Sequence, residues 1–167
     1  MKVLGIDPGS ETLGWGVIEG TGLKYNLVDF GTVKSSPREN FSKRILKIGV
    51  GVGEIIEKFQ PDVISVEEAF YATNVKVALK LGQIRGVVVF LGEKAGLEIA
   101  EYSPRLVKQT VVGYGNAEKY QVQEMVRLLL RLKTAPQPHD AADALANAIC
   151  HFHHAGAQTR INNAKLK

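Results

Sequence analysis

The sequence predicts an α/β domain built on a mixed five-stranded sheet, with helices packed on both of its faces. Two observations favour this fold class. Near the N-terminus, three β-like runs follow one another across short joins rich in Gly, Ser and Thr, which is typical of antiparallel neighbours. After them, two shorter β runs alternate with long segments of helical periodicity, which is typical of strands joined by crossover helices.

The individual elements follow from periodicity and from the residues that interrupt it. Pro37 opens a helix whose apolar positions recur every three or four residues up to Phe59, and Gln60-Pro61 ends it. We expect strands at 2–7, 13–19, 23–34, 62–67 and 97–102, a second long helix at 74–95, and further helices at about 104–112, 117–132 and 138–154. Residues 1–156 then form one domain, and 157–167 form a polar, flexible tail. This order is expected of a ribonuclease-H-like fold, but half of an actin-like ATPase shares it.

Composition indicates the size class and cellular location of the protein more clearly than its function. The chain has 167 residues, 45% of them hydrophobic and 23% charged, which is enough for one globular domain. Since no apolar run approaches the roughly 20 residues of a membrane span and no signal peptide is visible, we expect no membrane association. A single cysteine, Cys150, excludes an intramolecular disulfide and favours a cytoplasmic location. The net charge of +4 weakly favours an anionic partner such as nucleic acid.

Carboxylates stand at the ends of predicted elements. Asp7 closes the first strand, and Glu67-Glu68 closes the fourth. The last helix opens with Asp140 and Asp143, which share one helix face. Ligands of open α/β sheets gather beyond strand ends. Because side chains alternate along a strand, the small residues Gly5 and Ser65 leave space on the faces of Asp7 and Glu67, so we favour Glu67 over Glu68.

Each acid also has a simpler interpretation. Asp7 suits a turn, Glu67 suits a salt bridge at a strand end, and Asp140 and Asp143 suit a helix N-terminus. The polar positions 140, 143, 147, 151 and 154 would equally form the wet face of an amphipathic helix. Together, however, four clustered carboxylates would repel one another unless divalent cations shared their charge. The combination therefore predicts a site for two Mg²⁺ ions, which Mn²⁺ can replace, and metal-assisted phosphodiester hydrolysis.

Several residues near these acids suit contacts with nucleic acid. Phe70 can stack on unpaired bases or cover the edge of the core. Lys119 lies in the first turn of a helix, where the dipole disfavours a cation, so a phosphate contact explains it better; Arg105 and Lys108 precede it. His139 can assist Asp140 or be simply exposed. His151 and His154 have the spacing of metal ligands, but we expect no zinc there.

The sequence resembles the RuvC-type Holliday junction resolvases, the crossover junction endodeoxyribonucleases. The matching stretches run in order from residue 4 to about 150: LGIDPGS, GWGVI, QPDVISVEEAF, ALKLGQIRGV, RLVKQTVVGYGNAEKYQVQ and DAADALA. The resemblance implies a homodimer that cuts four-way DNA junctions by paired, symmetric, Mg²⁺- or Mn²⁺-dependent hydrolysis in recombination and repair, together with a branch-migration motor. It places the family's four catalytic acids on Asp7, Glu67, Asp140 and Asp143, its junction-facing aromatic on Phe70, and its DNA-contacting lysines on Lys108 and Lys119.

The residues support part of this implication and leave alternatives. Helix 74–95 is apolar nearly all round after its first turn, so we expect it to help form a dimer interface. One alternative is a RuvC-like nuclease of RNA processing. Another is an actin-like ATPase-type phosphate-binding domain, which would need a second domain and a second Gly-rich loop. A non-catalytic DNA-binding module would not need four convergent acids.

Overall fold

The computed structural model describes residues 1–22, 24–68 and 74–165, with side chains in these ranges up to Ala155. The elements, in chain order, are β1 (Lys2–Asp7), β2 (Thr12–Thr21), β3 (Lys24–Lys34), α1 (Phe41–Phe59), β4 (Val63–Glu67), α2 (Val75–Lys94), β5 (Glu98–Tyr102), α3 (Pro104–Val112), α4 (Lys119–Leu129) and α5 (His139–Lys165). The five predicted strands are confirmed with small differences at their ends. No helix in the described part of the chain combines the length and apolar character needed to cross a membrane.

The five strands form one mixed sheet in the order β3-β2-β1-β4-β5. β1 pairs antiparallel with β2, and β2 pairs antiparallel with β3. β4 lies parallel to β1 on its other side, and β5 lies parallel to β4. The predicted topology is therefore confirmed, and it makes β1 and β4 neighbours whose carboxyl ends lie at the same edge of the sheet.

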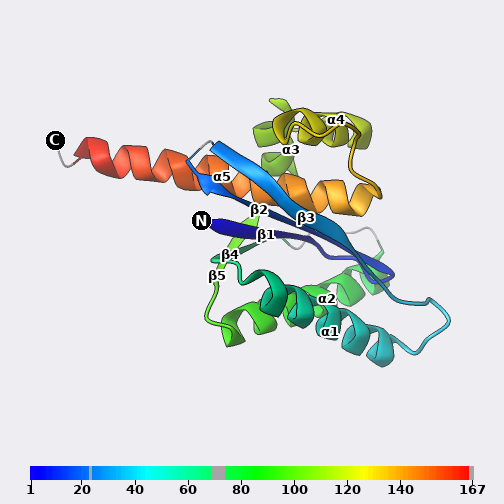
Figure 1. Cartoon of the computed structure of the whole chain (residues 1–167). Coiled ribbons are helices and arrows are strands. Elements are labelled where there is room, and N and C mark those ends of the chain that lie inside the picture. Colours follow the sequence, from blue (N-terminus) through cyan, green and yellow to red (C-terminus); the bar gives the residue numbers. More distant parts are fainter. Residues whose placement is uncertain (23, 69–73, 166–167) are drawn as a thin grey trace.

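Helices cover both faces of the sheet. In Figure 1, α1 and α2 lie on one face, α5 crosses the other, and α3 and α4 pack on the outer side of α5. Each face carries its own apolar cluster, because side chains of the same strand alternate between them. Leu4, Ile6, Ile64 and Val66 face α1 and α2, while Val3 and Val63 share a cluster with Leu145, Ile149 and Phe152 of α5.

Glycines let the backbone of α5 approach the strands more closely than any other residue would allow. A Cβ atom at Gly5 of β1 would lie 1.9 Å from the carbonyl oxygen of Ala144, and one at Gly14 of β2 would lie 1.9 Å from that of Asp140. The facing positions of α5 are small as well: Ala141 and Ala144 are fully buried. The N-terminal turns of α5 are thus seated directly on the centre of the sheet.

Two predicted helix boundaries are wrong. Pro37 does not open α1, because residues 36–39 form a turn in which the Glu39 amide donates to the Ser36 carbonyl (3.0 Å), and the helix begins at Phe41. The last helix continues past 154 to Lys165. Polar composition does not end a helix, and the segment contains no proline that would stop it. The division of the chain at 156/157 stays a prediction.

We expect Gly14→Ala to destabilise the fold by about 1–3 kcal/mol, because the added methyl group meets the main chain of Asp140 and one of the two elements must move. Urea unfolding followed by circular dichroism measures this loss. The control is Gly53→Ala in α1, where nothing lies within 4 Å of the new Cβ. That variant should be neutral or slightly stabilising, since alanine favours a helix. Equal stability of the Gly14 variant and the wild type would contradict the close approach.

Candidate active site

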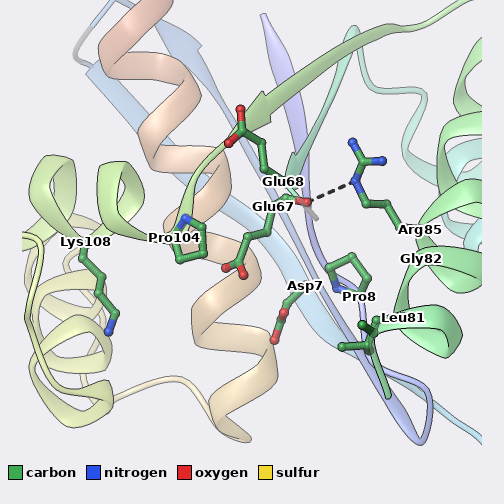
Figure 2. A pocket seen from close by; sticks show the side chains of 10 residues that line it. Asp7, Pro8, Glu67, Glu68, Leu81, Gly82, Arg85, Pro104 and Lys108 are labelled. Carbon is green, nitrogen blue, oxygen red and sulfur yellow. Dashed lines mark hydrogen bonds between the residues drawn. The ribbon is translucent and has the colours of Figure 1, made fainter. Parts of the chain in front are cut away.

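The two strand-end carboxylates project side by side. In the parallel pair, Gly5 lies opposite Ser65 and Ile6 opposite Val66, so Asp7 and Glu67 come next on their strands. Figure 2 shows the Glu67 carboxylate pointing toward Asp7, whereas the Glu68 carboxylate points the opposite way. The sequence-based choice of Glu67 over Glu68 as the neighbour of Asp7 thus agrees with the structure.

Hydrogen bonds hold α5 against the ends of the same two strands. The Ser65 hydroxyl donates to the main-chain carbonyl of Asn147 (2.8 Å), and the Asn147 amide nitrogen donates to the carbonyl of Ile6 (2.9 Å). Both side chains are buried. Asn147 lies one helical turn after Asp143, so these bonds fix the helix at the level where its acidic residues face the sheet.

A turn of residues 8–11 follows Asp7 and is held by a buried arginine. Arg44 of α1 is 5% exposed. Its Nε donates to the carbonyl of Ser10 (3.1 Å) and to the hydroxyl of Ser35 (3.2 Å), and its Nη2 also donates to Ser10. Because a buried guanidinium is costly without acceptors, these contacts fix the turn firmly to α1.

Two adjoining cavities open at this edge of the sheet. The larger has a volume of about 430 Å³, and its lining includes Asp7, Glu67, Glu68, Arg85 and Lys108. The smaller, of about 240 Å³, is lined by Asp7, Glu67, Lys108, Lys119 and Asp143, among others. Acidic groups from the sheet and from α5 therefore share one hollow with lysines from α3 and α4.

Burial and mutual repulsion perturb the carboxylates. Burial raises the pKa of Asp7 to about 7, and the charges of Asp143, Glu67 and Asp140 add to this, against Lys119. Burial also raises the pKa of Glu67 to about 7, with Asp143 adding and Lys108 and Lys119 opposing. The pKa of Asp143 is raised, again mainly by burial. The group thus resists full ionisation unless positive charge is supplied.

The lysines compensate this charge only partly. Lys119 Nζ lies 3.8 Å from Asp143 Oδ2, but the Lys119 side chain is 73% exposed, so the pair is weak. Within the described ranges, no three His, Cys, Asp or Glu side chains are arranged so that they would hold a metal ion. The oxygen-only donor set is nevertheless the type that Mg²⁺ and Mn²⁺ prefer.

Other predicted site residues lie further out. Arg105 is exposed on α3, and its aliphatic stem packs over Gly115 instead of lining either cavity. His139 is exposed at the start of α5, close enough for its charge to act on Asp143. Phe70 lies outside the described residues. The pair His151 and His154 faces Tyr102: its hydroxyl bonds to His151 Nδ1 (3.0 Å), and its ring stacks on His154.

Three positions near the site were missed in the sequence. Arg44 stands in an amphipathic helix, where an arginine usually marks the solvent side, and Arg85 stands in a helix that is apolar nearly all round. The sequence pattern places Asn147 and His151 in a polar stripe that could be the solvent-facing side of an amphipathic helix. In the structure they are only 1% and 4% exposed. The spacing of four from Asp143 was the one available signal that Asn147 belongs near the acids.

Comparison with known proteins identifies the family of this chain. A sequence model described as crossover junction endodeoxyribonuclease RuvC matches residues 3–151. The chain belongs to the RuvC family. A crossover junction endodeoxyribonuclease RuvC from Chloroflexus aggregans is 51% identical over 151 residues, which cover 90% of this chain and 92% of the relative. The predicted resemblance to the RuvC family is therefore confirmed.

Solved structures confirm the predicted ribonuclease-H-like fold. RuvC of T. thermophilus, solved in complex with a Holliday junction substrate, is 41% identical and superposes with a TM-score of 0.89 over 95% of this chain and 97% of that one. The yeast mitochondrial Holliday junction resolvase shares the fold at 17% identity, with a TM-score of 0.71 over 98% of this chain and 83% of that one.

The raised pKa values predict how pH changes the stability of the metal-free protein. Asp7 binds its proton more tightly in the folded state, with a pKa of about 7 against 3.8, so its ionisation destabilises the fold as pH rises from about 4 to 7. We expect Asp7→Asn to be more stable than the wild type by about 1–3 kcal/mol at pH 8 and to lose most of this advantage at pH 4.5. Thermal unfolding in EDTA measures the difference. Glu54→Gln, at an exposed position of α1, is the control and should keep the wild-type pH profile. A pH-independent gain for Asp7→Asn would contradict the raised pKa.

Proposed function

We propose that this RuvC-family protein is a structure-selective endonuclease that resolves four-way DNA junctions in recombination and repair. The observation that carries the proposal is the convergence of carboxylates from β1, β4 and α5 on one hollow with lysines at its rim. An actin-like ATPase, a nuclease of RNA processing and a non-catalytic DNA-binding module fit less well, because the family model spans almost the whole described domain.

The metal ligands we propose are Asp7, Glu67, Asp140 and Asp143. Their support is the donor chemistry and the raised pKa of three of them, which shows how strongly the ionised group needs compensating charge. A divalent cation, and two Mg²⁺ or Mn²⁺ ions in the full arrangement, would activate a water and stabilise the leaving oxygen of a phosphodiester.

The chain's own residues supply binding and orientation. Lys108 and Lys119 line the rim from different helices, where they can contact phosphates of the cut strand and offset the acidic centre. Arg105 is exposed on α3, outside the hollow, and suits a phosphate further along the duplex. Phe70 as the residue that stacks at the junction, and His139 as an auxiliary group, remain expectations from the sequence. So does the branch-migration motor, which only the family resemblance supports.

We further propose that the protein acts as a homodimer through α2. Val75, Leu79 and Phe90 are 69%, 63% and 63% exposed, and helical spacing places them on one stripe with Gly82 and Gly86. The space around both glycines is open, so a second helix can approach closely there. An apolar stripe of this kind suits a second copy of the chain, and two-fold symmetry suits symmetric cutting of a junction with two-fold symmetry.

Cleavage assays test the assignment of the acids. With Mg²⁺ and a mobile four-way junction, the wild type should make paired, symmetric nicks, while Asp7→Asn and Glu67→Gln should lose about 100-fold or more of the rate. Both variants should still bind the junction in EDTA, because fold and lysines are intact. Glu68→Gln should keep most of the rate, since its carboxylate points away from Asp7. Undiminished cutting by Asp7→Asn would refute its role, and equal cutting of linear duplex would remove junction selectivity.

Sedimentation measurements test the dimer. Leu79→Glu places a charge in the middle of the α2 stripe and should convert a dimer at micromolar concentration into a monomer, because the charge would have to be buried on association. Leu128→Glu, at a similarly exposed position of α4 (51%), is the matched control and should stay dimeric. A monomeric wild type at that concentration would rule out the interface.

A further inference from the structure

The main-chain carbonyl of Glu67 lies at a position of the β1–β4 ladder where the neighbouring strand offers no amide hydrogen. The Glu68 amide donates to the Tyr102 carbonyl on β5, so the carbonyl of Glu67, one residue earlier, points to the opposite neighbour, β1. In a parallel ladder a carbonyl accepts from the residue after its register partner. The register of Ile6 with Val66 makes Asp7 the partner of Glu67, and the expected donor is residue 8.

Residue 8 is a proline and has no amide hydrogen. The donor comes instead from α2, on the other side of the larger cavity: Arg85 Nε donates to the Glu67 carbonyl at 3.3 Å (Figure 2). The terminal Nη2 of the same guanidinium pairs with Glu101 of β5. The Arg85 side chain is only 21% exposed and Glu101 is 42% exposed, so the bond to the Glu67 carbonyl is the more sheltered of the two contacts.

We propose that Arg85 is a positioning residue for cleavage, which replaces the strand donor missing at Pro8 and thereby fixes the main chain from which Glu67 projects toward Asp7. The inference rests on the proposed function, because it assigns Arg85 a part in that same site. β4 has five residues and Glu67 is its last, so the direction of this side chain depends on how the strand end is held.

Arginine suits this task better than lysine. Its planar fork donates through Nε and Nη2 at once, and thus joins the end of β4 to β5 and to α2. A lysine offers one point charge at the end of a flexible chain. The cations that act on the charge of the Glu67 carboxylate are Lys108 and Lys119. Arg85 instead contacts the main-chain carbonyl of Glu67, so its contribution to the site is made through geometry.

The first test compares Arg85→Met and Arg85→Lys with a matched control, Arg127→Met, which breaks an arginine–glutamate pair with Glu124 on α4. We expect Arg85→Met to lower the single-turnover cleavage rate about 10- to 100-fold and to weaken Mn²⁺ binding by the free protein about 10-fold, as loss of a supporting contact around a metal ligand does. Arg85→Lys should fall in between. Junction affinity in EDTA should change less than about twofold, and Arg127→Met should match the wild type throughout.

The second test restores the missing amide. Pro8→Ala supplies an N–H group at the ladder position, so the double variant Pro8→Ala/Arg85→Met should cut faster and bind Mn²⁺ more tightly than Arg85→Met alone. Such a rescue is not expected if the guanidinium merely supports the fold or touches DNA. Glu101→Gln, which removes the charge from the second contact of Arg85 and weakens it, should give a smaller loss of the same kind and serves if Arg85→Met does not fold.

Three results would overturn the inference. They are a folded Arg85→Met with wild-type rate and Mn²⁺ affinity, a loss of junction affinity as large as the loss of rate, and additive effects of the Pro8 and Arg85 changes. These outcomes are separable from failure of the proposed function. If the wild type does not cut junctions, the Mn²⁺ titrations still decide the role of Arg85. If the wild type cuts and Arg85→Met is indistinguishable from it, only the role of Arg85 fails.

Discussion

The seating of α5 on the middle of the sheet is the contact on which the rest of the structure depends. Without side chains at Gly5 and Gly14, main chain meets main chain, and no bulkier pair would bring the helix so near. Because the helix lies so close, Asp140 and Asp143 lie near the strand end that carries Asp7. It also gives α3 and α4, with Lys108 and Lys119, a surface on which to pack. A helix held further from the sheet by larger side chains would leave Asp140 and Asp143 further from Asp7.

The resulting site brings together carboxylates that repel one another. Three carboxylates have raised pKa values because they are buried beside one another, and Lys119, whose side chain is 73% exposed, neutralises them only weakly. Such an arrangement lowers the stability of the isolated fold at neutral pH, which is a common cost of a functional site. Around it the supports are unusually firm: the buried Arg44 holds the turn after Asp7, and Ser65 and Asn147 tie α5 to both strands.

Much of this could be predicted from the sequence, for physical reasons that differ from one element to the next. Strands and long helices follow from periodicity, and the pairing of Asp7 with Glu67 follows from side-chain alternation and the small residues beside them. The start of α1 could not be predicted, because Pro37 is as compatible with a turn as with the first turn of a helix. The end of α5 could not either, because polar residues do not stop a helix. No local pattern predicts the contacts of Arg44, Arg85 and Asn147, because their partners are main-chain carbonyls distant in sequence.

The chain order of the site has a consequence for how the protein is made. Asp7 lies in the first strand and Glu67 near the middle, while Asp140 and Asp143 belong to the last helix. During synthesis, β1 through β5 can leave the ribosome with one face of the sheet still bare, since α5 is the element that covers its centre. A partly made chain therefore lacks both the helix that completes the core and two of the four acids of the site, Asp140 and Asp143. Any activity of the acidic centre begins only when folding is complete, which keeps unfinished copies from acting on the genome.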